Sequence, residues 1–174
     1  MVVAFVVADL ILSIAFVILY NGLVSARQRV REGWSAIDVQ LKRRSSLIPN
    51  LVEVVKGAAD YERGTLQQLA EARSAAGVAA GPREAARADA SLTGAIRTFF
   101  AVAEAYPELK TSERFAQLQR DLADTENKIA YARNYYNGAV ELYNNKVQRF
   151  PGLVVARALR FAPAEFFAAD DLHG

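Results

Sequence analysis

The chain has 174 residues, of which 52% are apolar and 23% charged, and it contains no cysteine. This composition excludes the disulfide-stapled secreted class, and the length predicts a single domain. A formal net charge of +2 gives no reason to expect a nucleic-acid partner. The single histidine, His173, excludes His-based metal sites and Ser-His-Asp or Cys-His catalytic groups within one chain.

The first residues form an apolar segment long enough to cross a membrane. From Met1 to Leu19, 17 of 19 residues are apolar, and about 20 such residues in a helix match a hydrocarbon core of ~30 Å. Tyr20 follows where aromatic side chains favour the interface, and basic residues outnumber acidic ones from there to Arg44. Residues 1–20 are therefore predicted to anchor the chain in a bacterial inner membrane, with the N-terminus outside and the bulk of the protein cytoplasmic.

A cleaved signal peptide is the competing interpretation of this segment. Val24, Ser25 and Ala26 offer small residues at plausible cleavage positions. The anchor is favoured because no basic residue precedes the apolar run, the run exceeds a usual signal-peptide core, and the cationic stretch beyond it resists translocation.

Asp9 lies near the middle of the predicted span. An ionised carboxylate costs about 2.5 to 3.5 kcal/mol there on insertion scales. One interpretation is a helix-helix contact or proton-coupled site in an oligomer. The other is a protonated or solvated side chain that a very apolar helix tolerates.

Hydrophobic periodicity predicts four helices in residues 21–150. Apolar residues recur every three or four positions over about 21–45, 48–76, 82–106 and 112–149. No turn signal separates the membrane span from the first of these helices. The predicted fold class is therefore all-α, with an N-terminal transmembrane helix that continues into an antiparallel four-helix bundle.

A chain reversal is expected between Arg44 and Asn50. Ser45 and Ser46 can cap a helix, and Pro49 suits the first turn of a new one, where its missing N–H has no partner. Beyond the bundle, residues 151–174 are expected to form a tail. Phe166 and Phe167 are expected to pack on the bundle, with the membrane surface as the alternative.

Two groups of polar residues are candidate partner-binding positions. They lie at the expected reversal and on the last helix: Asp38, Lys42, Arg43, Arg44 and Asn50, with Arg133, Tyr135 and Asn137. Adjacent arginines present planar donors for carboxylates or phosphates. Capping, inter-helix ion pairs and core hydrogen bonds are the structural alternatives.

No sequence motif indicates catalysis. The chain has no Glu-x-x-His pair of a di-iron bundle, and its glycine-rich segment from Gly77 to Pro82 lacks the Lys and Ser/Thr of a phosphate loop. We therefore predict a protein that is not an enzyme and that takes no cofactor or metal.

Long ordered blocks of this sequence resemble the LemA family. The blocks are Tyr20–Val24, Trp34–Arg44, Leu47–Glu53, Ala103–Pro107 and Asp124–Arg133. The chain departs from the family pattern at Ser45–Ser46 and at Ala58–Tyr61. The resemblance implies a membrane-anchored helical bundle with a cytoplasmic soluble part and no known catalytic residue. It also implies membrane partners. The family includes a magnetosome-membrane relative linked to vesicle formation, and its members are often encoded near membrane metalloproteases.

The predicted function is a membrane-anchored scaffold or adaptor that recruits or organises membrane protein partners, among which a membrane metalloprotease is one candidate. The alternative is membrane remodelling by self-assembly on the cytoplasmic leaflet. That alternative would use Asp9, the basic residues after the span and the aromatic tail.

Overall fold

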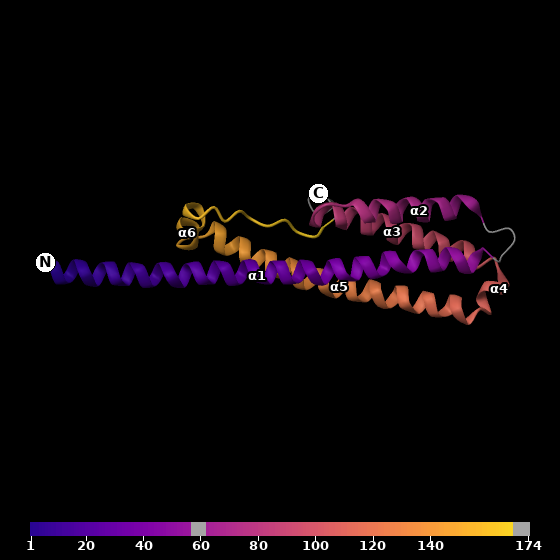
Figure 1. Ribbon diagram of the computed structural model, residues 1–174, viewed down its shortest axis with the longest axis horizontal. Coiled ribbons are helices and arrows are strands. Elements are labelled where there is room, and N and C mark those ends of the chain that lie inside the picture. The colour runs from indigo at the N-terminus through magenta and orange to yellow at the C-terminus, as the bar shows by residue number, and fades with distance from the viewer. Residues whose placement is uncertain (57–61, 169–174) are drawn as a thin grey trace. The chain divides into compact units, whose positions relative to one another are not determined.

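The computed structural model describes residues 1–56 and 62–168. Six helices follow one another in this part of the chain (Figure 1): α1 (Val2–Val55), α2 (Arg63–Val78), α3 (Pro82–Ala103), α4 (Pro107–Lys110), α5 (Glu113–Gln148) and α6 (Gly152–Ala158). The described residues contain no strand, which confirms the predicted all-α class. The family departure at Ala58–Tyr61 and the histidine at 173 lie outside the described residues.

The chain forms two compact units. Among the described residues, unit 1 contains 1–34 and 134–166, and unit 2 contains 35–56, 62–133 and 167–168. Both long helices, α1 and α5, therefore contribute residues to each unit.

The reversal expected between Arg44 and Asn50 is wrong, because α1 continues through Pro49 to Val55. Ile48, Leu51 and Val55 are each at most 1% exposed, so their burial holds this stretch in the helical register. Packing of this kind outweighs a cost of about 3 kcal/mol for a proline inside a helix. The second helix consequently begins at Arg63 and not near residue 48.

A side chain from α2 replaces the helical hydrogen bond that Pro49 cannot form. A proline lacks the N–H that would reach the carbonyl four residues earlier, which here belongs to Ser45. The Arg73 Nε donates to that carbonyl at 3.3 Å. A guanidinium from a neighbouring helix thus gives a donor to the carbonyl that Pro49 leaves without its helical partner.

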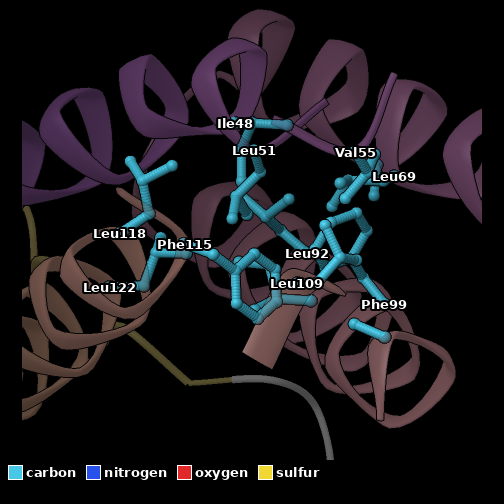
Figure 2. Close-up of a cluster of buried hydrophobic side chains, with 13 residues drawn as sticks. Ile48, Leu51, Val55, Leu69, Leu92, Phe99, Leu109, Phe115, Leu118 and Leu122 are labelled. Carbon is cyan, nitrogen blue, oxygen red and sulfur yellow. The ribbon is translucent and has the colours of Figure 1, made fainter. Parts of the chain in front are cut away.

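The core of unit 2 is a cluster of 13 buried apolar residues drawn from α1, α2, α3, α4 and α5. Figure 2 shows Ile48, Leu51 and Val55 on α1 facing Leu92 and Phe115 across this core. Phe99, Phe100 and Phe115 add edge-on and tilted ring contacts with centroids 5.5 to 6.4 Å apart, a range favourable for aromatic pairs.

The helices of unit 2 pair in an antiparallel way. Arg43 on α1 forms an ion pair with Asp124 on α5, and further along α1 Glu53 pairs with Arg114, earlier on α5. Residue numbers therefore rise along one helix as they fall along the other. α2 and α3 pack on each other (Figure 1). In the described part of this unit, the four long helical segments are therefore joined by one short helix, α4.

In unit 1, α1 and α5 approach closely at Gly33. A Cβ atom at this position would lie 3.0 Å from the Tyr136 Cα and 3.2 Å from the Tyr135 Cδ1. The Trp34 ring, next in sequence, contacts the Tyr136 ring at a centroid distance of 5.9 Å. Because Gly33 has no side chain, α1 and α5 can approach this closely beside the ring pair.

The variant Gly33→Ala is expected to lower the free energy of unfolding by about 1 kcal/mol. Overpacking against the α5 backbone costs ~1 to 3 kcal/mol and outweighs the helix preference of alanine. The control is Gly138→Ala, where nothing lies within 4 Å of the new Cβ, so stability should rise by about 0.5 to 1 kcal/mol. Thermal unfolding of both variants in detergent, followed by circular dichroism, measures the difference. Equal gains would contradict the proposed close approach.

The segment after α6 is hydrogen-bonded along α5. The Tyr136 hydroxyl donates to the Glu165 carbonyl at 2.7 Å, and the Tyr143 hydroxyl donates to the Ala162 carbonyl at 2.9 Å. Asn144 both donates to the Ala164 carbonyl and accepts from the Ala164 N–H, at 2.9 and 2.8 Å. Tyr136, Tyr143 and Asn144 of α5 thus hold the tail through hydrogen bonds to its backbone.

Burial raises the pKa of Tyr136 to about 12, and the nearby carboxylate of Glu165 acts in the same direction. The ordinary value is 10.0, so folding keeps this phenol protonated. Its contribution to stability is complete below pH 10 and is lost as the pH rises from 10 through 12. The parent chain and the variant Tyr136→Phe are each titrated to alkaline pH by absorbance. The difference between the two curves should show one phenol that ionises with a midpoint near pH 12. A midpoint near pH 10 would contradict this burial.

Candidate functional site

Unit 2 contains a cleft of ≈ 440 Å³ that is lined by several charged side chains. Its lining combines three arginines and two carboxylates with small and apolar residues: Arg44, Asp89, Arg97, Glu126 and Arg133, with Ala86, Ala90, Thr93, Gly94, Ile129, Ala130, Phe167 and Ala168. We call it the arginine cleft. The alanine-rich α3 supplies one wall, in which small side chains lie between the charged ones.

Arg44 lies at the base of the arginine cleft and is only 2% exposed. Its Nη1 bonds the Asp89 Oδ1 at 2.9 Å, and its Nη2 lies 3.9 Å from the Glu126 Oε2. The Arg44 Nε is buried and has no hydrogen-bond partner among the described residues. A guanidinium so fully removed from water needs paired charge to offset its desolvation.

Asp89 is the close partner of Arg44. Burial raises the pKa of this carboxyl above its ordinary value, outweighing the attraction and hydrogen bond of Arg44, while the charge of Glu126 raises the pKa further and that of Arg133 lowers it. The Thr93 hydroxyl donates to the Asp89 backbone carbonyl at 2.8 Å. Asp89 is thus fixed in position but unfavourably desolvated.

Glu126 is loosely held at the mouth of the arginine cleft. Its carboxylate lies 3.9 Å from Arg44 and 3.7 Å from Arg97, and the Glu126 and Arg97 side chains are 50% and 77% exposed. Both separations exceed hydrogen-bond length. Three guanidiniums and two carboxylates leave a formal surplus of one positive charge, so the cleft can accept an additional carboxylate or phosphate group.

The structure separates the residues expected to form one basic corner on α1. Lys42 pairs with Asp38 at 2.6 Å, and Arg43 pairs with Asp124 at 3.2 Å. Both pairs are exposed, whereas Arg44 is buried in the arginine cleft. Asn50 is exposed and lies within α1, five residues before the helix ends at Val55. Lys42, Arg43 and Arg44 therefore do not present their charges as one surface, which corrects the expected geometry.

The three residues expected on the last helix also differ in placement. Arg133 lines the arginine cleft in unit 2. Tyr135 and Asn137 belong to unit 1, where Tyr135 is 49% exposed and Asn137 is half-buried. Asp89, Arg97 and Glu126 complete the cleft and were not singled out as its members from the sequence.

The residues expected at the membrane fall into three settings. Asp9 is exposed on the apolar part of α1. Tyr20 makes an edge-on contact with Phe161 at 6.3 Å, and Arg27 lies 5.7 Å above the same ring, a cation–π geometry. Phe166 is 43% exposed, whereas Phe167 is 3% exposed and lines the arginine cleft. The two tail phenylalanines therefore do not act as a pair.

One helix of the described residues, α1, is long and apolar enough to cross a membrane. Its most apolar stretch of 18 residues contains no buried residue. Within the same residues, no group of three His, Cys, Asp or Glu side chains is placed to hold a metal ion. These features define an all-α protein with a candidate membrane anchor and a charged cleft.

Comparison with known proteins identifies the family. The family model described as the LemA family matches residues 33–173, and the chain therefore belongs to the LemA family, as its sequence blocks predict. It is similar to "Protein LemA" of Metamycoplasma hominis, with 24% identity over 156 residues that cover 87% of this chain and 70% of that protein.

Magnetosome proteins are also among the relatives. "Magnetosome protein MamQ 2" of Paramagnetospirillum magneticum is 24% identical over 175 residues, and "Magnetosome protein MamQ" of Magnetospirillum gryphiswaldense is 22% identical over 174 residues. Each match covers 85% of this chain and 64% of the relative. The chain thus spans slightly less than two thirds of the length of these magnetosome proteins.

Proposed function

We propose that this LemA-family protein is a membrane-anchored adaptor that recruits membrane protein partners through the arginine cleft and performs no catalysis. The anchor is residues 1–20, placed in a bacterial inner membrane with the N-terminus outside and unit 2 in the cytoplasm. A membrane metalloprotease that offers an acidic segment is one partner of the required chemistry.

The observation that carries this proposal is the exposure of the apolar part of α1. Val3, Phe5, Leu12 and Ile18 are each between 65% and 76% exposed. Burying such side chains in hydrocarbon contributes roughly 1.5 to 3 kcal/mol each. Lipid supplies that burial along a helix of this length, and α1 continues without a break to Arg44 in the arginine cleft.

Charge supports an acidic partner for the arginine cleft. Arg97 is largely exposed, and Glu126 has no hydrogen bond to either neighbouring guanidinium. A carboxylate from another protein can form bidentate bonds with Arg97 or Arg133 in its place. Bidentate, charge-assisted bonds of this kind are stronger than single surface ion pairs.

Crosslinking in native membranes tests the adaptor role. The variant Arg97→Glu/Arg133→Glu should lose the discrete hetero-partner that the parent chain captures, at equal membrane content. The matched control is Arg114→Glu/Arg120→Glu, which makes the same charge change on exposed positions of α5 in unit 2 and should retain the partner. Loss in both variants, or in neither, would contradict recruitment by the arginine cleft.

Self-assembly on the cytoplasmic leaflet is the second candidate function. It is favoured by the relatives named magnetosome proteins and by Asp9, a carboxylate within the apolar part of α1 that an oligomer could shield. The same crosslinking would then give a ladder of homo-oligomers in place of a discrete partner, and Asp9→Leu would abolish the ladder.

A further inference from the structure

Unit 1 contains an apolar groove of ≈ 560 Å³ at the end of the predicted membrane span. Ile18, Leu19 and Leu23 of α1 form one wall, and Leu142 of α5 and Phe150 form the other. The volume falls within the range of small-molecule sites, about 300 to 1,000 Å³.

Three apolar side chains in the walls of this groove are unusually exposed for their chemistry. Ile18 is 65%, Leu142 57% and Phe150 82% exposed. Ile18 also belongs to the exposed apolar run that begins at residue 2, so the groove opens where that run ends. Tyr20 follows at once, and aromatic residues of this kind concentrate at the membrane–water interface.

Two cations lie on the same groove, and none of its lining residues is acidic. Lys146 and Arg149 belong to the lining, and the Lys146 Nζ donates only a long bond of 3.3 Å to the Gly22 carbonyl. Asn145, also in the lining, adds an amide. Positive donors beside apolar walls match a phosphate joined to acyl chains, and basic pockets at membrane-proximal helices bind such headgroups.

We propose that this groove binds one anionic glycerophospholipid, with its phosphate on Lys146 and Arg149 and its acyl chains along Ile18, Leu142 and Phe150. This inference rests on the proposed membrane anchor. Hydrocarbon is the preferred occupant over a protein segment because the apolar wall is continuous with the membrane-spanning part of α1.

Native mass spectrometry of the full chain in non-ionic detergent tests the site. Titration with phosphatidylglycerol should show one tightly retained lipid, and phosphatidylcholine should bind at least about tenfold more weakly. The variant Lys146→Gln/Arg149→Gln should weaken phosphatidylglycerol binding by about 30-fold, the factor typical of two membrane-surface cations, and should leave phosphatidylcholine binding unchanged.

The matched control is Arg157→Gln/Arg160→Gln, which removes two cations from unit 1 outside the groove and should keep the single tight lipid. Equal weakening in both double variants would overturn the proposal in favour of general electrostatic attraction. Displacement of the lipid by glycerol 3-phosphate at similar concentration would show a site for free phosphate and overturn it too, as would failure of the parent chain to retain any lipid.

Carbonate extraction separates this proposal from the membrane anchor. Release of the parent chain from membranes by carbonate would refute the anchor itself. The groove proposal alone is wrong if the parent chain and both double variants stay in the membrane, while Lys146→Gln/Arg149→Gln leaves phosphatidylglycerol binding unchanged.

Discussion

Replacing Arg44 with methionine is expected to lower the free energy of unfolding by about 3 to 5 kcal/mol, the range for breaking a buried ion pair. Arg44 is 2% exposed and Asp89 15% exposed in their side chains. Methionine roughly fills the space of the arginine stem but leaves the Asp89 carboxylate without its close partner. The desolvation of Asp89, which already raises its pKa, would then be uncompensated.

The double variant Arg44→Met/Asp89→Leu should recover most of this loss. Replacing both members of a buried pair by apolar residues is often neutral or stabilising. Urea unfolding of the parent chain, both single variants and the double variant in detergent gives the coupling free energy as a double-mutant cycle. Additive costs in the two single variants would contradict a buried, coupled pair.

Replacing Gly152 with alanine is expected to lower the free energy of unfolding by about 2 to 3 kcal/mol. A Cβ at this position would overlap the backbone carbonyl of Lys146, and neither group is the flexible end of a side chain. The turn between α5 and α6 must therefore shift, and steric strain of this kind is among the larger single-substitution effects.

The matched control for Gly152→Ala is Val154→Ala, since Val154 lies in the same helix α6 and is 59% exposed. This control should change stability by no more than about 0.5 kcal/mol. Thermal unfolding followed by circular dichroism compares the two variants directly. A Gly152→Ala protein as stable as the parent would contradict the close contact with Lys146.

The helical class was predictable from the sequence because apolar spacing reports directly on helix faces. Pro49 and the two serines before it predict a reversal that this spacing contradicts. Positions 37, 44, 48, 51 and 55 are all buried and share one face, with spacings that match a continuous helix on both sides of Pro49. The tertiary hydrogen bond from Arg73 that relieves Pro49 has no local sequence signal.

The arginine cleft was predictable only in part. Arg44 occupies a position in the buried register of α1, and this register was the available signal that its charge points inward. Asp89 and Glu126 come from α3 and α5, so their pairing with Arg44 depends on helix packing that spacing alone does not determine. The same holds for the tail, because Asn144 and Ala164 meet through two hydrogen bonds across a turn and a short helix.

The central claim is that residues 1–20 hold the protein in the membrane with unit 2 in the cytoplasm, and thiol labelling measures this most directly. The chain has no cysteine, so Val2→Cys and Tyr131→Cys each introduce a unique thiol at positions 75% and 79% exposed. With a membrane-impermeant maleimide, the account predicts that Val2→Cys is labelled on intact spheroplasts, whereas Tyr131→Cys is labelled only after lysis. Labelling of Tyr131→Cys on intact spheroplasts would contradict it.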